Sequence, residues 1–312
     1  MKRTLRQIAW RLLAGVCVLW GAATLTFLAM HLSGGDIAMA ILGGPDAMPT
    51  PQLLARVRSE YGLDLPLWVQ YGHYITRLAH GDLGESYRLR IPVTQAIGSQ
   101  INATLQLAVS AAVVAVVLAL VAALLTAKRA PWIRSLASGS EVVMSSMPTF
   151  VVGVLLLLAF SYHGHALPPA GNRGWTSLIL PTLALALPVS ALLAQVLRQA
   201  LEEVLEQPFI AMARARGLSD TGVRLQHALR HALVPLITLA GFIFASLLGG
   251  AVIIEQLFAR QGLGRLMLTA STNKDVPIVL GITLLAAGAY VVVNLLVDLI
   301  NHWVDPRTQD AH

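Results

Sequence analysis

The chain has 312 residues, of which 56% are hydrophobic and only 12% are charged, and its mean hydropathy is +0.68. Soluble domains carry about a quarter charged residues, so this composition excludes an ordinary soluble globular protein. The formal net charge is +6, and the lone cysteine, Cys17, excludes an intrachain disulfide.

Six uncharged apolar stretches are each long enough to cross a lipid bilayer. A helix of about 20 apolar residues spans a hydrocarbon core roughly 30 Å thick. Lipid cannot hydrogen-bond exposed backbone, so each stretch is expected to be helical. The predicted spans are residues 12–30, 104–127, 142–162, 174–197, 232–254 and 276–297. The sequence therefore predicts an all-α integral membrane protein with six transmembrane helices.

The basic residues predict the orientation of these spans. Of the 22 Lys and Arg residues, thirteen lie before the first span or after the second, fourth or sixth. These four segments share one side of the membrane if all six spans cross it. Short loops rich in Lys and Arg stay in the cytoplasm, which predicts that both termini are cytoplasmic. This topology also accounts for the positive charge without a nucleic-acid partner.

The predicted spans divide the chain into four parts. The first span exceeds the 7–15 apolar residues of a signal peptide, so it is interpreted as a retained anchor. The parts are residues 1–30, the cytoplasmic N-terminus and first transmembrane helix; 31–103, an external loop with amphipathic helices; 104–305, a five-helix core with a cytoplasmic loop at 198–233; and 306–312, a cytoplasmic tail.

Two amphipathic helices are predicted in the external loop. Thr50 can cap the first, Pro51 suits its first turn and Gly62 can end it. Pro66 can open the second, which Gly81 can end. Two interpretations of these helices remain open: they pad the outer mouth of the bundle, or they help to seat an external partner.

Polar and helix-breaking residues within the spans are few. Pro148 interrupts the third span and Pro188 the fourth, and each permits a kink. Asn294 and Asp298 fall on one face of the sixth span, where a carboxylate is a functional candidate. A structural ion pair between Asp298 and Arg198 is the preferred interpretation. No carboxylate or histidine lies at the membrane midplane, which argues against a proton-coupled transporter.

The cytoplasmic loop predicts a helical hairpin. Pro208 can open a short helix over residues 208–216, Gly217 can end it with a left-handed residue, and Ser219 can cap the next helix. Apolar side chains on the short helix, Phe209 among them, suit either a docking element or a helix lying on the lipid surface. Docking is the preferred interpretation.

Catalytic and metal-binding motifs are absent. The chain has no phosphate-binding P-loop, no G-x-S-x-G, no H-E-x-x-H and no Cys/His cluster with metal-ligand spacing. His163 and His165 form an H-x-H pair, but a complete metal site normally needs further ligands, so they are interpreted as part of a wetted loop. The sequence therefore predicts no catalytic residue, no metal ligand and no enzymatic activity.

Several segments carry a family resemblance. Residues 211–219 read AMARARGLS and residues 227–235 read HALRHALVP. This pattern resembles the EAA loop of ABC-importer permeases, in the dipeptide, oligopeptide and nickel branch. Ala211 stands where the naming glutamate would be, and His231 stands where that branch usually has asparagine. Segments 61–71 with 81–84, 249–255 with Phe258 and 262–264, and 294–299 with 305–307 are similar to the same branch, so the likeness is collinear over nearly the whole chain.

The resemblance implies a type I ABC-importer permease fold in the bacterial cytoplasmic membrane. The implied partners are a second homologous permease, two ABC ATPase subunits that bind ATP and Mg²⁺, an extracytoplasmic substrate-binding protein and membrane lipid; no nucleic acid and no cofactor in this chain are implied. The substrate would be a short peptide or a chelated metal such as nickel. A self-sufficient secondary transporter or channel is the alternative, but it predicts inverted repeats that the sequence lacks.

The resemblance also implies roles for particular residues. The residues expected to couple to the ATPase are Phe209, Ile210, Ala211, Met212, Ala213, Arg214, Ala215, Arg216, Gly217 and Leu218. The candidates for the translocation pathway or its gate are Pro148, Pro188, Glu255, Asn294 and Asp298.

Overall fold

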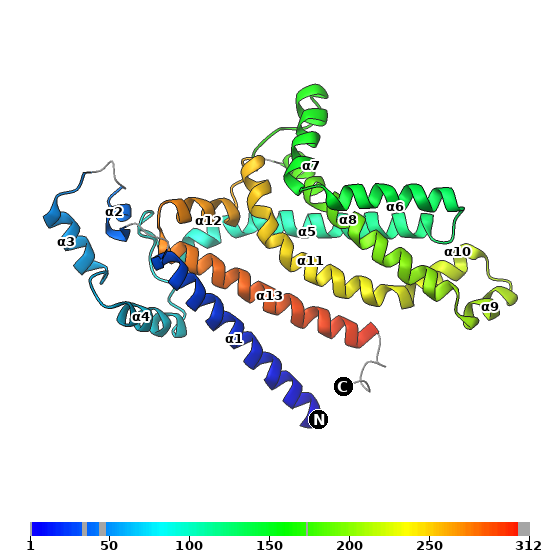
Figure 1. Ribbon diagram of the computed structural model, residues 1–312, viewed down its shortest axis with the longest axis horizontal. Helices are drawn as coiled ribbons and strands as arrows, with labels where there is room; N and C mark the ends of the chain where they lie inside the picture. Colours follow the sequence, from blue (N-terminus) through cyan, green and yellow to red (C-terminus); the bar gives the residue numbers. More distant parts are fainter. Residues whose placement is uncertain (1, 33–35, 44–47, 173, 305–312) are drawn as a thin grey trace. The chain divides into compact units, whose positions relative to one another are not determined.

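A computed structural model describes residues 2–32, 36–43, 48–172 and 174–304, and helices dominate it (Figure 1). Over those ranges there is no strand, only an isolated bridge between Glu85 and Pro92. The helices are α1 Lys2–Leu32, α2 Ile37–Ile41, α3 Pro51–Glu60, α4 Leu67–Ala79, α5 Val93–Thr126, α6 Pro131–Ser146, α7 Thr149–Leu156, η2 Leu157–His163, α8 Thr176–Leu205, α9 Pro208–Ala215, α10 Asp220–Gly222, η3 Val223–Ala228, α11 Leu229–Leu257, α12 Leu263–Thr272 and α13 Val276–Val304.

Each of the six predicted spans lies largely within helix. Fewer than six of the described helices, however, have the length and composition of a membrane span. Three do so in the described part of the chain: Val93–Thr126, Thr176–Leu205 and Val276–Val297. A bent helix pair makes a fourth if it counts as one span, and Leu13–Ala29 is a shorter apolar helix. The count of six spans and the cytoplasmic placement of the termini stay predictions.

The bent pair corrects the prediction for the third span. It was expected over residues 142–162, but the helical segment begins at Pro131 and turns by 101° between α6 and the α7–η2 helix (Figure 1). The bend falls at Met147, whose ψ of 129° is extended, because a residue before proline is driven out of the helical region. The interruption predicted at Pro148 is confirmed, whereas the predicted helix start, residue 142, lies about three helical turns after the observed start at Pro131.

Contacts within the chain define two compact units. Unit 1 contains residues 1–102 and 261–291, and unit 2 contains residues 103–260 and 292–312. In unit 2, α8 packs against α6, α7 and α11 and supplies many of the buried side chains. In the same core, a stripe of alanines at every fourth position along α5 and just after its end is fully buried: Ala111, Ala115, Ala119, Ala123 and Ala127. Such small residues let helix backbones approach closely.

Unit 1 is held together by aromatic contacts between α1 and α4. The Phe27 ring contacts His31, Tyr71 and Tyr74, with centroid distances of 4.1, 5.4 and 5.8 Å. The hydroxyls of Thr24 and Tyr71 also share a hydrogen bond of 2.6 Å. The α1–α4 contact therefore combines ring packing with a polar bond.

The helix ends predicted in the external loop are confirmed. The Thr50 side chain accepts a hydrogen bond from the backbone N–H of Leu53, and Pro51 is the first residue of α3. Gly62, which follows α3, has a φ of +63°, and Gly81, which follows α4, has a φ of +76°. These left-handed conformations favour glycine.

A buried carboxylate fixes the loop between α4 and α5 to the start of α13. Asp275 is 3% exposed. Its oxygens accept hydrogen bonds from the Ser86 hydroxyl at 2.5 Å and from the backbone N–H groups of Tyr87 at 3.1 Å and Arg88 at 3.3 Å. A carboxylate with this many donors is strongly held, and it brings residues 189 positions apart in sequence into contact.

We expect Asp275→Ala to lower the apparent unfolding temperature of the purified chain clearly. The change leaves three donors without their acceptor, and a hydrogen bond to a charged group contributes about 1.5–3 kcal/mol. Thermal unfolding in detergent measures the effect. Asp64→Ala is the matched control, because Asp64 is exposed in the same unit. Equal unfolding temperatures for the two variants would contradict the role assigned to Asp275.

Candidate functional site

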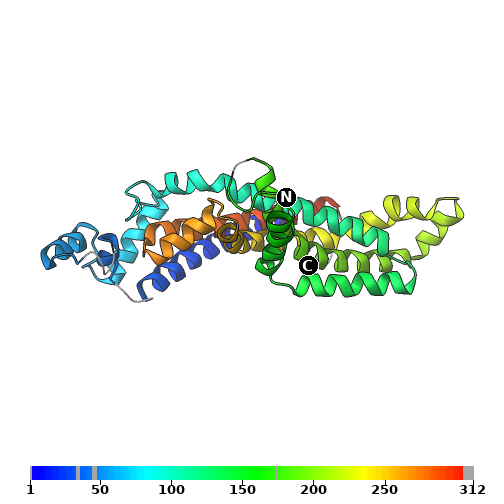
Figure 2. The same ribbon diagram turned by 90° about the horizontal axis from the view of Figure 1, so that it is seen from above.

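The most prominent feature of unit 2 is a helical hairpin of α9 and α10, residues 208–222, which we call the elbow. Both views show it beyond the ends of α6 and α8 (Figures 1 and 2). Pro208 is the first residue of α9, where its missing N–H is tolerated. Gly217 follows α9 with a φ of +84° and donates its N–H to the carbonyl of Arg214 at 2.9 Å. The hairpin and its glycine turn, as predicted from the sequence, are confirmed.

The elbow has a buried face and an exposed face. Ile210 is 1% exposed and Ala213 is 8% exposed, and both belong to the core of unit 2. Met212 is 59% exposed and Phe209 is 36% exposed. The remaining residues expected to couple to a partner are exposed, except for half-buried Leu218: Ala211, Arg214, Ala215, Arg216 and Gly217. A rigid helix is thus anchored by one side and open on the other.

Polar contacts fix the elbow to itself and to the body of unit 2. The Ser219 hydroxyl accepts a hydrogen bond from the N–H of Gly222 at 3.2 Å, as predicted for a cap. Arg214 and Asp220 form an ion pair of 3.2 Å across the turn. Beyond the elbow, Arg224 donates to the carbonyl of Leu124 near the end of α5 at 3.1 Å. A displacement of the elbow can therefore be passed on to α5.

A ring contact adds to this attachment. The Phe209 ring meets the His231 ring edge to face, with centroids 5.4 Å apart. His231 stands in the segment after η3, at the position where the resembling family usually has asparagine. In this chain the His231 ring packs against Phe209 of α9, so the residue that departs from the family pattern has a role in packing.

A buried ion pair lies beside the core of unit 2. Arg198 of α8 donates to both carboxylate oxygens of Glu141 on α6, at 2.8 and 2.6 Å, and to the Ser138 hydroxyl at 3.1 Å. Both charged side chains are 8% exposed. The expected partner of Arg198 was Asp298, whose side chain lies outside the described residues. Arg198 has a two-pronged bond to Glu141 on α6, and its pairing with Asp298 stays a prediction.

A second buried carboxylate of unit 2 is Glu255, a candidate for the pathway or its gate. It is fully buried near the end of α11 and accepts a hydrogen bond of 2.6 Å from the Thr104 hydroxyl. Arg260, 2% exposed, donates to the carbonyls of Gly171 and Ser177 at 3.5 and 3.4 Å. Burial lowers the pKa of Arg260, and the charge of Glu255 opposes that shift. Glu255 thus lies in a packed charged cluster at the end of α11.

The other pathway candidates lie on three helices. Pro148 caps α7 at the bend, and Pro188 is buried inside α8, which continues through it. Asn294 is half-buried in α13, and Asp298 belongs to the same helix. A role for these residues in a pathway stays a prediction.

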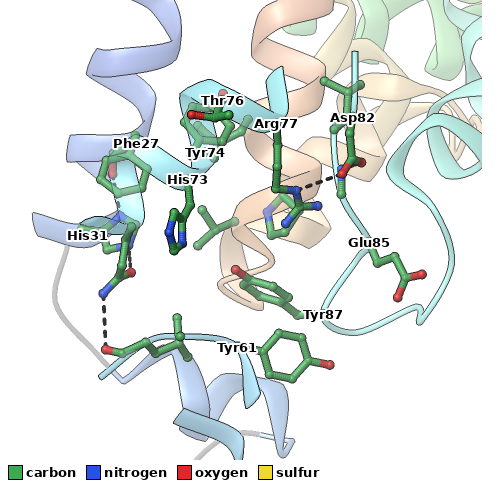
Figure 3. Close-up of a pocket in the computed structure, with 18 of the residues that line it drawn as sticks. Phe27, His31, Tyr61, His73, Tyr74, Thr76, Arg77, Asp82, Glu85 and Tyr87 are labelled. Atoms are coloured by element: carbon green, nitrogen blue, oxygen red, sulfur yellow. Dashed lines mark hydrogen bonds and ion pairs between the residues drawn. The ribbon is translucent and has the colours of Figure 1, made fainter. Parts of the chain in front are cut away.

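Unit 1 contains a cavity of about 750 Å³ that the sequence did not indicate. Figure 3 shows aromatic and charged side chains from α1, α4 and the following loop around it. The Tyr74 hydroxyl at this cavity is buried with no hydrogen-bond partner in the described part of the chain. Burial also raises the pKa of Tyr74 to about 12, so the phenol keeps its proton at neutral pH.

Two family models match the chain. Residues 115–310 match the binding-protein-dependent transport system inner membrane component, and residues 4–108 match the N-terminal part of the corresponding membrane component. Together they extend over nearly all of the sequence.

Relatives of known name are similar over the same length. The glutathione transport system permease protein GsiC of Salmonella typhimurium is 36% identical over 303 residues, which are 97% of this chain and 98% of the relative. A Brucella abortus protein whose name describes a peptide transport system permease is 37% identical over 308 residues, 96% of this chain and 97% of the relative.

A solved structure shares the fold. A crystal structure of an amino acid ABC transporter with histidines matches with a TM-score of 0.51 and 21% sequence identity. The match covers 69% of this chain and 94% of the solved chain.

Proposed function

We propose a function from one premise: this chain belongs to the binding-protein-dependent transport system inner membrane component family. It is a transport component of the inner membrane, not an enzyme, and its family works with a substrate-binding protein and an ATPase. We assign it as the permease subunit of an ABC importer for short peptides. It would form half of the pathway with a second homologous permease, above two ATPase subunits that bind ATP and Mg²⁺.

The similarity to two transport permeases over almost their whole length carries this proposal. Their names specify glutathione and peptide transport systems, which favours a short peptide over a chelated metal as the substrate. A self-sufficient secondary transporter is not favoured, because the family depends on a binding protein.

The elbow supports a mechanical role. Its exposed Met212 and Phe209 suit an apolar groove on an ATPase subunit, while buried Ile210 and Ala213 attach it to the core of unit 2. Closure of the ATPases would push the elbow, and the rigid helix would pass the displacement to the bundle. In this scheme the permease itself breaks no bond, and ATP hydrolysis by the partner drives the change between two bundle states.

Reconstitution in liposomes tests the proposed function. We expect a labelled tripeptide to accumulate only when the chain is combined with its partner permease, its ATPases, its binding protein and ATP. Omission of any one component should reduce uptake to the background of empty liposomes. Accumulation by this chain alone would overturn the assignment and favour a secondary transporter.

A further inference from the structure

The cavity of unit 1 is of the size that proteins use for small ligands. Its volume of about 750 Å³ falls within the range of about 300–1,000 Å³ that is typical of ligand pockets. The ends of α1 and α13 contribute to its wall, together with α4 and the loop that follows it. All of the residues around it belong to unit 1, so the cavity is complete within that unit.

Three hydrogen-bond donors at this cavity have unused capacity. Tyr74 contributes the buried hydroxyl without a partner. The Nε of Arg77 donates to Asp82 at 2.9 Å, and no acceptor in the described residues meets its two terminal nitrogens. The side chain of His73 extends toward the cavity in Figure 3 and has no hydrogen bond to any residue in the described ranges.

The two carboxylates at the cavity, Asp82 and Glu85, differ in whether they have hydrogen-bond partners in the described residues. Both oxygens of Asp82 are occupied, one by Arg77 and the other by the backbone N–H of Gly84 at 2.8 Å. These contacts lower the pKa of Asp82, the backbone bond from Gly84 contributing most. Glu85 lies at the rim, exposed, and no partner for its carboxylate occurs in the part of the chain that the structure describes. The cavity therefore offers free donors in its wall and a free negative charge at its edge.

The wall between these groups is aromatic. The rings of Tyr61 and Tyr87 meet edge to face, with centroids 5.1 Å apart. The Phe27 ring stacks on Tyr74 on another side of the cavity, with an interplanar angle of 17°. Aromatic faces with a few fixed polar groups are the usual composition of a small-molecule site.

We propose that this cavity is a binding site for a short zwitterionic peptide. The carboxylate end would be held by Arg77, His73 and Tyr74, and the ammonium end would be held by Glu85. The charges of Arg77, Asp82 and Glu85 sum to −1, so a ligand with only negative charge is disfavoured and a zwitterion is accommodated. This inference rests on the proposed function for its choice of ligand, and it adds a substrate site in unit 1, separate from the elbow.

Ligand analogues and two variants test this site. The probe is tri-alanine, titrated calorimetrically against the full-length chain in lipid nanodiscs without ATPases or binding protein. We expect binding to weaken at least tenfold for tri-alanine amide, which lacks the carboxylate, and for N-acetyl-tri-alanine, which lacks the ammonium group. Glu85→Gln should weaken tri-alanine binding about tenfold but should not weaken N-acetyl-tri-alanine binding, because that analogue has no ammonium group for Glu85 to hold and its carboxylate is repelled by the Glu85 charge.

Tyr74→Phe separates a binding role from a structural one. The change removes a hydroxyl that has no partner in the described structure, so the unfolding temperature should not fall, while tri-alanine binding should weaken several-fold. The matched controls are Glu60→Gln and Tyr162→Phe, at exposed residues that do not line the cavity, and both should bind tri-alanine as the unaltered chain does.

Three results would overturn the site. They are a lack of tri-alanine binding by the unaltered chain, equal affinity for tri-alanine in both cavity variants and the unaltered chain, or equal affinity of the unaltered chain for tri-alanine and both of its analogues. The liposome experiment keeps this outcome distinct from failure of the proposed function. ATP-driven peptide uptake without binding in the cavity removes only the site, whereas cavity binding without uptake by the complete system removes only the transport assignment.

Discussion

Gly217→Val is expected to reduce ATP-driven uptake at least tenfold while the protein still inserts in the membrane. Gly217 ends α9 with a φ of +84°, a conformation that a β-branched residue adopts only with strain. No atom lies within 4 Å of the position that a Cβ would take, so the effect is conformational and not a clash. The strained turn would rotate α9 and misplace the exposed Met212. Uptake by the reconstituted transporter is the measurement, with membrane content determined by immunoblot.

Gly217→Asn is the control for this prediction. Asparagine tolerates the left-handed region far better than valine, so this variant should keep most of the uptake. The larger Gly217→Trp should also insert normally and lose uptake. Unimpaired uptake by Gly217→Val would remove the elbow from the coupling mechanism, since the glycine turn is what sets the direction of α9.

Arg198→Met is expected to destabilise the chain strongly. The change leaves the Glu141 carboxylate buried without its positive partner and the Ser138 hydroxyl without a donor. Removal of one member of a buried pair typically costs about 3–5 kcal/mol, because the remaining charge is uncompensated. The apparent unfolding temperature in detergent, followed by tryptophan fluorescence, should fall sharply.

The double variant Glu141→Met with Arg198→Met should recover much of that loss. Replacement of a buried ion pair by apolar side chains of similar size is often neutral or stabilising. Lys128→Met breaks an exposed ion pair with Glu206 and serves as the control, which should leave the unfolding temperature unchanged. If Arg198→Met and Lys128→Met had the same unfolding temperature, the buried ion pair would contribute no more to the stability of unit 2 than the exposed one.

Features set by a few neighbouring residues could be predicted from the sequence. The start of α3 at Thr50 and Pro51 follows from capping chemistry that acts within one helical turn. The glycine turn at Gly217 and the cap at Ser219 are of the same kind. In each case a local rule decides the backbone conformation, and the structure has the expected one.

Features that join distant residues could not be predicted in this way. Glu141 lies 57 positions from Arg198 in the sequence, and Asp275 lies 189 positions from Ser86. Neither pair leaves a periodic pattern in the sequence, because each contact forms only when distant segments pack together. The predicted third span began only at residue 142, although residues 131–141 form the first turns of α6. The signal that could have found the pair is the lone acidic residue, Glu141, in the otherwise uncharged run from 135 to 162.

The alanine stripe of α5 has a consequence for motion inside unit 2. Alanine has no side-chain rotamers, so a surface made of it does not interlock with neighbouring side chains as leucines do. A helix packed against such a surface can shift by a small step without any alanine side chain having to change its rotamer. The stripe from Ala111 to Ala127 therefore gives unit 2 an even packing surface, along which the displacement proposed for the elbow would travel without unpacking the interior.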